Sequence, residues 1–492
     1  MKILLVYPET PSTFWSFKDA LKFISKKSAE PPLGLITVAA MLPKEWEKRL
    51  IDMNVVKLND TDLLWADYVF LSGMSVHAAS VKQIIRRCNK TGTKIVAGGP
   101  LFTTQYQEFL GIDHFVLNEA EITLPMFLSD LKIGTTRRIY TTDQFPDISL
   151  SPIPMWELLE TKKYASLSLQ YSRGCPYNCE FCSITMLNGR QPRTKSKDQF
   201  IAELDRLYES GYRGSLSVVD DNFIGNKREL KSRILPAIIN WQKEKKYPFN
   251  FITEVSINLS DDDELIKLMV DAAFASIFVG IETTNDESLG ECGKFQNRKR
   301  DLIQSVRKLQ NYGMQVSAGF IIGFDHDPPD IFEQQINFIR RSGIVSAMVG
   351  LLNAPTGTHL YNRLKEENRL LEGWSGNNMD GVTNIIPKMN YKDLIAGYAH
   401  VIHTIYSPKE YYKRIKSFLG EYKVPSWKSQ MLTLTEIRAF IKLVWFIGLF
   451  EKGKRYFWRT FVYSLFKYPG KFSLAMTLTV YGYHFRRIAA TL

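Results

Sequence analysis

The chain of 492 residues is too long for one ordinary domain core and predicts two or three domains. Hydrophobic residues make up 45% and charged residues 23%, which is typical of a globular protein. Five cysteines, an odd number with three of them clustered, do not form a disulfide framework, and the N-terminus has no signal-peptide pattern. The sequence therefore predicts a protein of a reducing cytosol.

The net charge of +12 lies entirely in the C-terminal part of the chain. Residues 409–492 contain 16 Lys and Arg but only 4 Asp and Glu, together with 20 of the 62 aromatic residues. The apolar run 437–450 is too short to span a bilayer and contains Lys442. We therefore interpret residues 372–492 as a separate helical region with a basic and aromatic surface.

Residues 1–150 alternate between strand and helix patterns. The run 2–7 is continuously apolar, as expected of a strand that is covered on both faces. Helices are predicted at 31–42, after a proline, and at 78–92, which ends at a glycine. Further strands are predicted at 49–55, 68–73, 94–99 and 114–118. This alternation predicts a Rossmann-like domain, a parallel sheet with helices on both faces.

A Rossmann-like sheet binds its ligand beyond the carboxyl ends of its strands. Those ends are expected at 72–77, 98–103 and 118–121, so the candidate binding residues include His77, Gly98 and Gly99. The G-x-G-x-x-G fingerprint is absent, which argues against a nicotinamide or flavin dinucleotide. The two glycines either allow the backbone to approach a large flat ligand or only form a turn.

Residues 166–371 repeat a strand-and-helix unit at intervals of roughly 35 residues, as in a parallel barrel. Two of the intervening helices are predicted at 197–211 and 261–273. The fold expected is an incomplete barrel of α/β class, with its chemistry on the loops that follow the strands. Six strands are predicted, at 167–174, 216–222, 249–258, 276–283, 315–325 and 346–355. The polar residues expected at the strand ends are Asp220, Asp221, Asn222, Glu282, Asp325 and Asn353.

Three of the five cysteines, Cys175, Cys179 and Cys182, lie in the segment SRGCPYNCEFCS (172–183). A structural zinc ion needs four nitrogen or sulfur ligands, and no fourth ligand lies near in the sequence, although a distant one remains an alternative. Inert buried cysteines would be unusual in so polar a stretch. Three thiolates suit a [4Fe–4S] cluster that leaves one iron open to chelate a substrate or cofactor.

The C-x₃-C-x₂-C loop, with the aromatic Phe181 before its last cysteine, resembles the motif of the radical S-adenosylmethionine (SAM) enzymes. The resemblance covers the whole of residues 166–371 and implies that family's barrel. It implies that the amino and carboxylate groups of SAM chelate the open iron. It also implies that an electron from the cluster breaks the C–S bond of SAM to give a 5′-deoxyadenosyl radical.

The same resemblance suggests further cofactor-binding positions. VVDDN (218–222) resembles the strand end near the SAM amino group, which makes Asp220, Asp221 and Asn222 candidates. GIET (280–283) resembles the segment that faces the SAM ribose and carboxylate, which makes Glu282 a candidate. The segments that resemble those bordering adenine are GFIIGF (319–324) and LLNAPTGTHLY (351–361), the latter with Asn353.

A Rossmann-like module before such a barrel resembles the cobalamin-binding branch of the radical SAM family, and segments 31–42 and 95–100 resemble stretches of that branch. The cobalt-ligating D-x-H-x-x-G motif is absent, because Ser75 stands two residues before His77 and no glycine stands three residues after it. Many members of the branch lack this motif too. The resemblance therefore implies cobalamin binding, with His77 either as the cobalt ligand or as a polar residue at a strand end.

Two such cofactors imply that the adenosyl radical abstracts hydrogen from an unactivated C–H bond, that methylcobalamin delivers a methyl group, and that a second SAM remethylates cobalamin. The cysteine loop and the GGP loop (98–100) are then expected to line one cavity. An alternative is cobalamin-dependent cyclisation or rearrangement without methyl transfer. A tRNA methylthiotransferase is disfavoured because only Cys88 precedes the cysteine loop. A reducing partner such as ferredoxin or flavodoxin is implied.

The basic and aromatic C-terminal region fits three partners: an anionic membrane surface, nucleic acid, or the barrel itself, which the region would cap. The spacing of Trp, Tyr, Phe, Lys and Arg in 451–472 is typical of a membrane interface. The extension also resembles that of the branch containing a hopanoid lipid methylase, which implies a lipid or other hydrophobic substrate. We therefore expect a cytoplasmic protein with peripheral contact at the inner face of the membrane and no nucleic acid partner.

Overall fold

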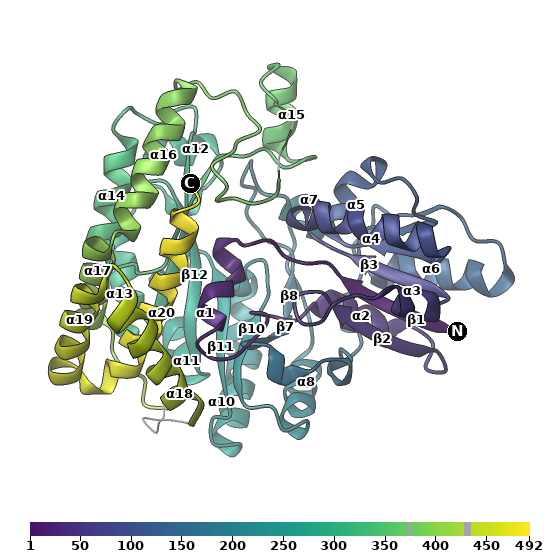
Figure 1. Ribbon diagram of the computed structural model, residues 1–492, viewed down its shortest axis with the longest axis horizontal. Coiled ribbons are helices and arrows are strands. Elements are labelled where there is room, and N and C mark those ends of the chain that lie inside the picture. Colours follow the sequence, from purple (N-terminus) through teal and green to yellow (C-terminus); the bar gives the residue numbers. More distant parts are fainter. Residues whose placement is uncertain (372, 374, 428–433) are drawn as a thin grey trace.

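The structure is a computed structural model that describes residues 1–371, 373, 375–427 and 434–492. Figure 1 shows two sheets side by side, with the C-terminal helices packed along the outer side of the second sheet. The predicted boundary of the C-terminal region, residue 372, lies outside the described residues. The predicted fold class, an α/β protein with a Rossmann-like domain, a partial barrel and a helical C-terminal region, is confirmed.

The first sheet has six parallel strands in the order β2-β1-β3-β4-β5-β6. Successive residues of β1 point to opposite faces, so Leu4 and Val6 enter one hydrophobic cluster and Ile3 and Leu5 another. This explains why the run is continuously apolar. The strands are β1 (Lys2–Tyr7), β2 (Glu47–Asp52), β3 (Tyr68–Ser72), β4 (Lys94–Gly98), β5 (His114–Val116) and the unpredicted β6 (Ile139–Tyr140).

Helices cover both faces of this sheet, as expected from its connections. One face carries α2 (Leu33–Met41) and α6 (Ala120–Ile133). The opposite face carries α3 (Asp60–Trp65), α4 (Ala78–Thr91) and α5 (Pro100–Gln105). The helix α4 ends at Gly92, whose φ of 72° is the left-handed conformation that glycine adopts without strain.

The second sheet also has six parallel strands, in the order β14-β13-β12-β11-β10-β7. In the described part of the chain β7 and β14 do not pair with each other, so the sheet is an open, partial barrel. Its strands are β7 (Ser166–Leu169), β10 (Gly214–Val218), β11 (Phe249–Val255), β12 (Phe274–Glu282), β13 (Gln315–Ile322) and β14 (Ala347–Leu351). The outer helices are α8 (Lys197–Glu209), α10 (Leu235–Glu244), α11 (Asp263–Asp271), α13 (Leu302–Tyr312) and α14 (Ile331–Ser342).

The predicted strand at 167–174 was wrong in its second half. The strand β7 ends at Leu169, because the backbone N–H groups of Tyr171 and Ser172 donate to the carboxylate of Asp220, at 2.7 and 2.8 Å, instead of to a neighbouring strand. Ser172–Arg173 then form β8, which pairs antiparallel with β9 (Arg193–Thr194) and closes the base of the cysteine loop.

The C-terminal region is helical, as predicted. The long helices are α16 (Tyr391–Tyr406), α17 (Pro408–Glu421), α18 (Leu434–Leu443), α19 (Lys454–Lys467) and α20 (Phe472–Ala489), and a π-helical segment η11 (Val444–Phe450) follows α18. No helix within the described ranges has both the length and the apolarity needed to cross a bilayer.

The N-terminal residues 13–27 leave the first domain and lie beside α20, which Figure 1 shows as the purple α1 (Lys18–Leu21) next to the yellow helix. Phe14 stacks on Phe485 with ring centroids 4.2 Å apart, and the backbone carbonyls of Thr13 and Phe14 contact Nε2 of His484 at 3.1 Å. The first segment of the chain and its last helix therefore fold as one layer over the barrel.

A buried cluster of four charges joins the first domain to the barrel. Arg173 contacts Glu119 at 2.8 Å and Glu121 at 2.9 Å, and Arg193 contacts Glu119 at 2.7 Å. The side chains of Glu119 and Glu121 are only 7% and 3% exposed, so each carboxylate depends on an arginine for its charge compensation. Burial alone would raise the pKa of Glu121, but the charge and hydrogen bonds of Arg173 hold that pKa below its ordinary value.

We predict that Arg173→Gln lowers the free energy of unfolding by about 3 kcal/mol, because it leaves the buried carboxylate of Glu121 without its arginine and removes one of the two arginines of Glu119. This loss of stability, relative to the native protein, should be greatest above about pH 4.3, the ordinary pKa of a glutamate. It should shrink at lower pH, as acid protonates Glu121. Urea unfolding followed by tryptophan fluorescence measures the loss.

The matched control is Arg206→Gln, which removes an exposed pair with Glu157 at 3.8 Å. Exposed pairs contribute roughly 0–1 kcal/mol, so this variant should unfold almost as the native protein does. Equal losses in the two variants would contradict the role given to the buried cluster.

Candidate functional site

The cysteine loop, residues 174–188, follows β8, ends with the short helix α7 (Ile184–Asn188) and carries all three clustered cysteines. Cys175, Cys179 and Cys182 are free thiols, with Cys179 buried and the other two half-buried. Burial raises the pKa of all three thiols, that of Cys182 to about 12, while the positive charge of Lys294 acts in the opposite direction on each. The three sulfur atoms and one lysine therefore share one weakly polar environment.

Two neighbouring carboxylates hold the base of the loop. Asp220 accepts from the backbone N–H of Tyr171 and Ser172 and from the hydroxyl of Ser172, at 2.6 to 2.8 Å. Asp221 accepts from the backbone N–H of Gly174 at 2.8 Å and from the side-chain amide of Asn188 at 3.0 Å. Gly174 and Asn188 are the two ends of the cysteine loop, so Asp221 clamps it closed. Burial raises the pKa of Asp220 to about 7.

Further contacts tie the middle of the loop to three other elements. Glu180 forms a bidentate pair with Arg363 of α15 (His359–Glu366), at 2.6 and 3.0 Å. The hydroxyl of Tyr177 accepts from the side-chain amide of Asn258 at 2.7 Å. The backbone N–H of Glu180 donates to the carbonyl of Cys292 at 2.9 Å. Contacts with three other elements of the protein thus hold the cysteine loop in place.

Glu282 and Lys294 form an ion pair of 2.7 Å next to the thiols, with both side chains at most 12% exposed. Glu282 lies at the end of β12 with φ of 65°, a conformation that non-glycine residues rarely adopt. A Cβ atom at Gly280 would lie 2.2 Å from Glu282 Oε1 and 2.7 Å from Lys294 Nζ, so the glycine makes room for the pair. Lys294 is a residue that sequence reasoning missed, because nothing around it in the sequence resembles a motif.

Other predicted site residues make mainly structural contacts. Asn222 is buried and accepts from the backbone N–H of Ser256 at 3.1 Å, which links the ends of β10 and β11. Asn353 accepts from the backbone N–H of Asn384 at 3.0 Å and donates to the carbonyl of Leu351. Phe181 packs against Phe324 with ring centroids 6.3 Å apart. These side chains position the loops around the cysteines.

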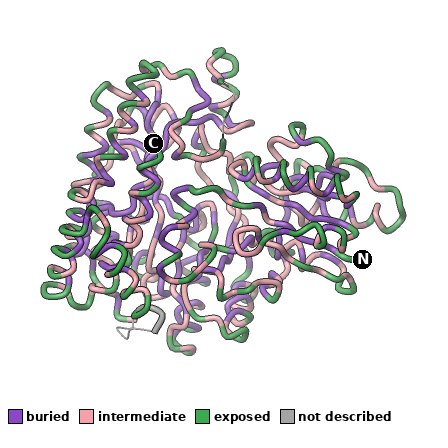
Figure 2. The backbone as a smooth tube through the Cα atoms, in the orientation of Figure 1, coloured by how far each residue is buried: buried purple, intermediate pink, exposed green. Residues whose placement is uncertain are grey.

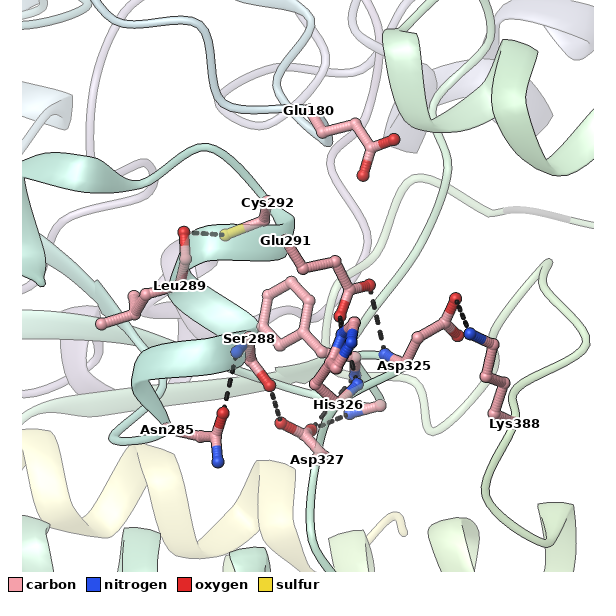
Figure 3. Close-up of polar contacts among 12 residues, drawn as sticks. Glu180, Asn285, Ser288, Leu289, Glu291, Cys292, Asp325, His326, Asp327 and Lys388 are labelled. Carbon is pink, nitrogen blue, oxygen red and sulfur yellow. Dashed lines mark hydrogen bonds and ion pairs between the residues drawn. The ribbon is translucent and has the colours of Figure 1, made fainter.

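The loop after β13 is fixed by an ionic cluster at the mouth of the barrel (Figure 3). Glu291 of α12 (Asp286–Glu291) accepts from His326 Nδ1 at 2.8 Å and from the backbone N–H of Asp325 at 3.2 Å. Asp325 itself pairs with Arg369 at 2.6 Å and with Lys388 at 3.5 Å. The charge of Asp325 is therefore already neutralised by protein groups.

The inner face of the barrel carries a carboxylate that sequence reasoning also missed. Glu254 of β11 is accessible to solvent, although protein atoms surround its carboxyl group. Burial, together with the charges of Asp221 and Glu30, raises the pKa of Glu254 to about 7. Its place in an alternating strand was the available signal, since only every second residue of β11 packs on the outer helices.

The residues that follow the strands of the first domain contact the barrel next to the cysteine loop. Asn118, Glu119 and Glu121 follow β5, and the two glutamates make the buried ion pairs with Arg173 beside Cys175. The predicted ligand edge of the first sheet therefore faces the predicted cluster loop. The sequence places Glu119 and Arg173 54 residues apart with no sign of pairing.

The two glycines at the end of β4, Gly98 and Gly99, are both constrained by close neighbours. A Cβ atom at Gly98 would lie 2.6 Å from the carbonyl oxygen of Val116, and one at Gly99 would lie 2.4 Å from Ser72 Oγ. Gly99 also has φ of 87° and directly precedes α5. Internal packing thus explains both glycines.

His77 is fully buried and uses both of its ring nitrogens. The backbone N–H of Met74 donates to Nδ1 at 3.0 Å, so Nε2 carries the proton and donates to Thr10 Oγ1 at 3.0 Å. Burial lowers the pKa of His77 to about 4, which keeps the ring neutral. These contacts leave no nitrogen lone pair for a cobalt ion, and they favour the reading of His77 as a polar strand-end residue.

The remaining cysteines lie in hydrophobic packing. Cys88 is fully buried on α4, and Cys292 is buried among Phe324, Leu352 and Leu360. Both act as small apolar side chains of the core.

The donor set fits an iron–sulfur cluster better than a single metal ion. In the ranges that the structure describes, no three His, Cys, Asp or Glu side chains converge as the ligands of one ion would. An iron–sulfur cluster needs no such convergence, because each thiolate binds a different iron. Three free thiols on one clamped loop, with a buried lysine facing them, suit a cluster that carries negative charge.

Profiles of known families match three successive parts of the chain. The B12 binding domain matches residues 24–128, the radical SAM superfamily residues 169–339, and a domain of unknown function, DUF4070, residues 358–492. The structure of the cobalamin-dependent S-adenosylmethionine radical enzyme OxsB, with aqua-cobalamin and S-adenosylmethionine bound, has a similar fold. Its TM-score is 0.64 at 16% identity, over 99% of this chain and 79% of that one.

Two relatives are similar over nearly the whole chain. An uncharacterized methyltransferase of Synechocystis sp. is 40% identical over 99% of this chain and 91% of its own length. The hopanoid C-2 methylase of Rhodopseudomonas palustris is 33% identical over 93% of this chain and 88% of its own length. The chain therefore belongs to the cobalamin-binding radical SAM methyltransferase family, and it is an enzyme with a [4Fe–4S] cluster, SAM and cobalamin as cofactors.

Proposed function

We propose that the enzyme transfers a methyl group to an unactivated carbon of a lipid or other hydrophobic substrate. The observation that carries this proposal is the buried cluster of Glu119, Glu121, Arg173 and Arg193, which holds the ligand edge of the first domain against the cysteine loop. Methyl transfer to a substrate radical needs two cofactors in such an arrangement. The similarity to a hopanoid C-2 methylase supports a lipid substrate.

Cys175, Cys179 and Cys182 would bind three irons of the cluster as thiolates and leave the fourth iron for SAM. When bound, the cofactors supply a 5′-deoxyadenosyl radical that removes a hydrogen atom and a methyl group that replaces it, with electrons from a reductant such as ferredoxin or flavodoxin. Asp220 and Asp221 would act by shaping the cysteine loop, because their oxygens are already used by its backbone.

Lys294 would compensate the negative charge that the thiols acquire when they release their protons and bind iron as thiolates. Glu282 would hold this lysine in place through the 2.7 Å ion pair and would border the SAM site. Asn222, Phe181 and Asn353 would fix the loops that surround SAM.

Gly98 and Gly99 would border the cobalamin, because they stand at the carboxyl end of β4, where a Rossmann-like sheet binds its ligand. We propose that cobalamin binds without His77 as a cobalt ligand, since both ring nitrogens of that residue are engaged. The first domain would then hold cobalamin through its strand-end backbone.

We further propose that the protein works in the cytoplasm and contacts the inner face of the membrane peripherally, where a lipid substrate would be found. Cyclisation or rearrangement of the substrate uses the same cofactors and differs only in its product. The mass of the product therefore separates the two reactions.

The first prediction of this assignment concerns the cluster. Cys175→Ala, Cys179→Ala or Cys182→Ala should each reduce iron and sulfide to a small fraction of the native content and abolish SAM cleavage, because a cluster with two thiolates is not retained. Cys88→Ala, which removes a buried thiol of the first domain, should keep the native iron content. Zinc in place of iron in anaerobically prepared protein would contradict the assignment.

The second prediction concerns the clamp on the loop. Asp221→Ala should reduce the iron content severalfold, because the N–H of Gly174 and the amide of Asn188 lose their acceptor and the ends of the loop separate. Asp262→Ala is the matched control: it removes the N-terminal cap of α11, at a cost of about 1 kcal/mol in stability, and should leave the iron content unchanged. Equal iron contents in both variants would argue against the clamp.

The third prediction concerns the product. Mass spectrometry of lipid extracts from cells with the native gene should reveal species heavier by one CH₂ unit than those from cells with the Cys175→Ala gene. Species lighter by two hydrogens would indicate cyclisation instead. Identical extracts would contradict the lipid substrate.

A further inference from the structure

The surface of α18, η11 and α19 has an unusual concentration of exposed apolar side chains. Ten of the 27 exposed large hydrophobic residues found in the described part of the chain lie between 437 and 466. The most exposed are Phe466 at 79%, Phe450 at 69% and Ile441 at 62%. Soluble proteins rarely leave such a group together in water unless it binds something.

The exposed residues form two stripes, one on each side of the turn at Glu451–Gly453. On α18 and η11 they recur every four residues, at Ile437, Ile441, Trp445 and Leu449. On α19 they recur at Trp458, Val462, Leu465 and Phe466. Residues at this spacing share one face of a helix.

Contacts between the helices make the two stripes parts of one surface. Phe440 stacks on Phe461 with ring centroids 6.0 Å apart, and Nε1 of Trp458 donates to the carbonyl of Gly448 at 2.9 Å. The other side of this helix pair packs on α17 and α20. Figure 1 shows α18 and α19 at the outer edge of the molecule, and Figure 2, in the same orientation, colours many residues of this region as exposed. We call residues 437–467 the docking face.

Positive charges surround the apolar stripes. Residues 437–471 contain eight Lys and Arg but only one acidic residue, Glu451, which pairs with Arg486. Lys454, Arg455 and Arg459 are exposed and have no ion pair with any described residue. A partner that covers this face must therefore offer apolar contacts and negative charge together.

A second copy of the chain does not meet this requirement. A symmetric dimer would place the docking face against itself, so that each group of lysines and arginines would meet an identical group. Juxtaposed like charges oppose association. An anionic bilayer surface offers both acyl chains for the aromatic residues and phosphates for the basic residues.

We propose that the docking face binds the surface of an anionic lipid bilayer, with Trp445, Phe450 and Phe466 inserted between the headgroups and the surrounding basic residues on lipid phosphates. The proposal deepens the proposed function and rests on it for the nature of the substrate, but its physical basis is this surface alone.

The docking face adjoins the segment that covers the open side of the barrel. Lys442 Nζ donates to the carbonyl of Lys22 and to Ser25 Oγ, and Phe446 packs edge-on against Phe23. The same N-terminal segment carries Trp15, whose ring contacts that of Phe278 on the inner face of β12 at 4.9 Å. A bilayer bound at the docking face would therefore lie next to the N-terminal segment, which reaches the inner face of β12 through Trp15.

Vesicle flotation with the anaerobically prepared holoenzyme tests the proposal. The native protein should float with vesicles of phosphatidylglycerol and phosphatidylcholine, should float much less with phosphatidylcholine alone, and should lose binding as salt is raised. The triple variant W445S/F450S/F466S should bind at least about tenfold more weakly, because three large apolar side chains no longer leave water.

The matched control is the triple variant L64S/L110S/I133S in the first domain, where the side chains are 67%, 79% and 69% exposed. It removes similar exposed apolar area elsewhere and should bind vesicles as the native protein does. A second variant, K454Q/R455Q/R459Q, should lose the preference for phosphatidylglycerol. Normal circular dichroism and iron content establish that each variant is folded.

Three outcomes would overturn the proposal. The first is a native protein that floats with neither kind of vesicle, and the second is a control variant that loses as much vesicle binding as W445S/F450S/F466S. The third outcome is a native protein that sediments as a dimer while W445S/F450S/F466S sediments as a monomer. If only the proposed function is wrong, the native protein should still float with the vesicles, but lipid extracts should contain no methylated lipid. Methylation of detergent-dispersed lipid by a variant that no longer floats would support both proposals.

Discussion

The arrangement of this protein depends on one buried group of charges, Glu119 and Glu121 of the first domain with Arg173 and Arg193 of the barrel. Charges removed from water are tolerated only when opposite charges lie at hydrogen-bonding distance from them. These four residues therefore allow the two domains one relative orientation where they meet. That relation brings the ends of the first sheet to the flank of the cysteine loop. An enzyme that combines a radical with a transferable methyl group needs its two cofactor sites to meet, and the three ion pairs of this cluster provide the orientation.

The acidic residues around the cysteines serve the loop more than they serve a ligand. Asp220 and Asp221 take up backbone N–H groups that no strand accepts, and this turns the chain out of β7 into a loop closed by β8 and β9. The cation that acts on all three thiols is supplied from another loop, by Lys294, and is held by Glu282, which has a strained backbone conformation. Strain of this kind is retained where surrounding structure over-determines it, which is common at functional sites.

The chemistry and the surface for the substrate are carried by different parts of the chain. The cysteines lie between the two domains, whereas the docking face lies on the C-terminal helices. The N-terminal residues 13–27 connect them, since Trp15 reaches the inner face of β12 while Phe23 packs on η11. Stacking of Phe14 on Phe485 fixes this segment to the last helix. A basic, aromatic tail thereby becomes part of the wall of the active-site domain instead of a free appendage.

The sequence alone determined the fold class, the three regions and the place of the cysteine loop, because these follow from local patterns: apolar runs, strand-and-helix alternation, and three thiols within eight residues. It also located the polar residues at the strand ends. Which groups those residues contact was decided only by the tertiary structure. Asp221 clamps a loop, Asn353 holds Asn384, and both nitrogens of His77 are engaged, since a hydrogen bond depends on which groups the fold brings within about 3 Å. Glu119 and Arg173, 54 residues apart, carry no mark of their pairing in the sequence, because long-range ion pairs have no periodicity.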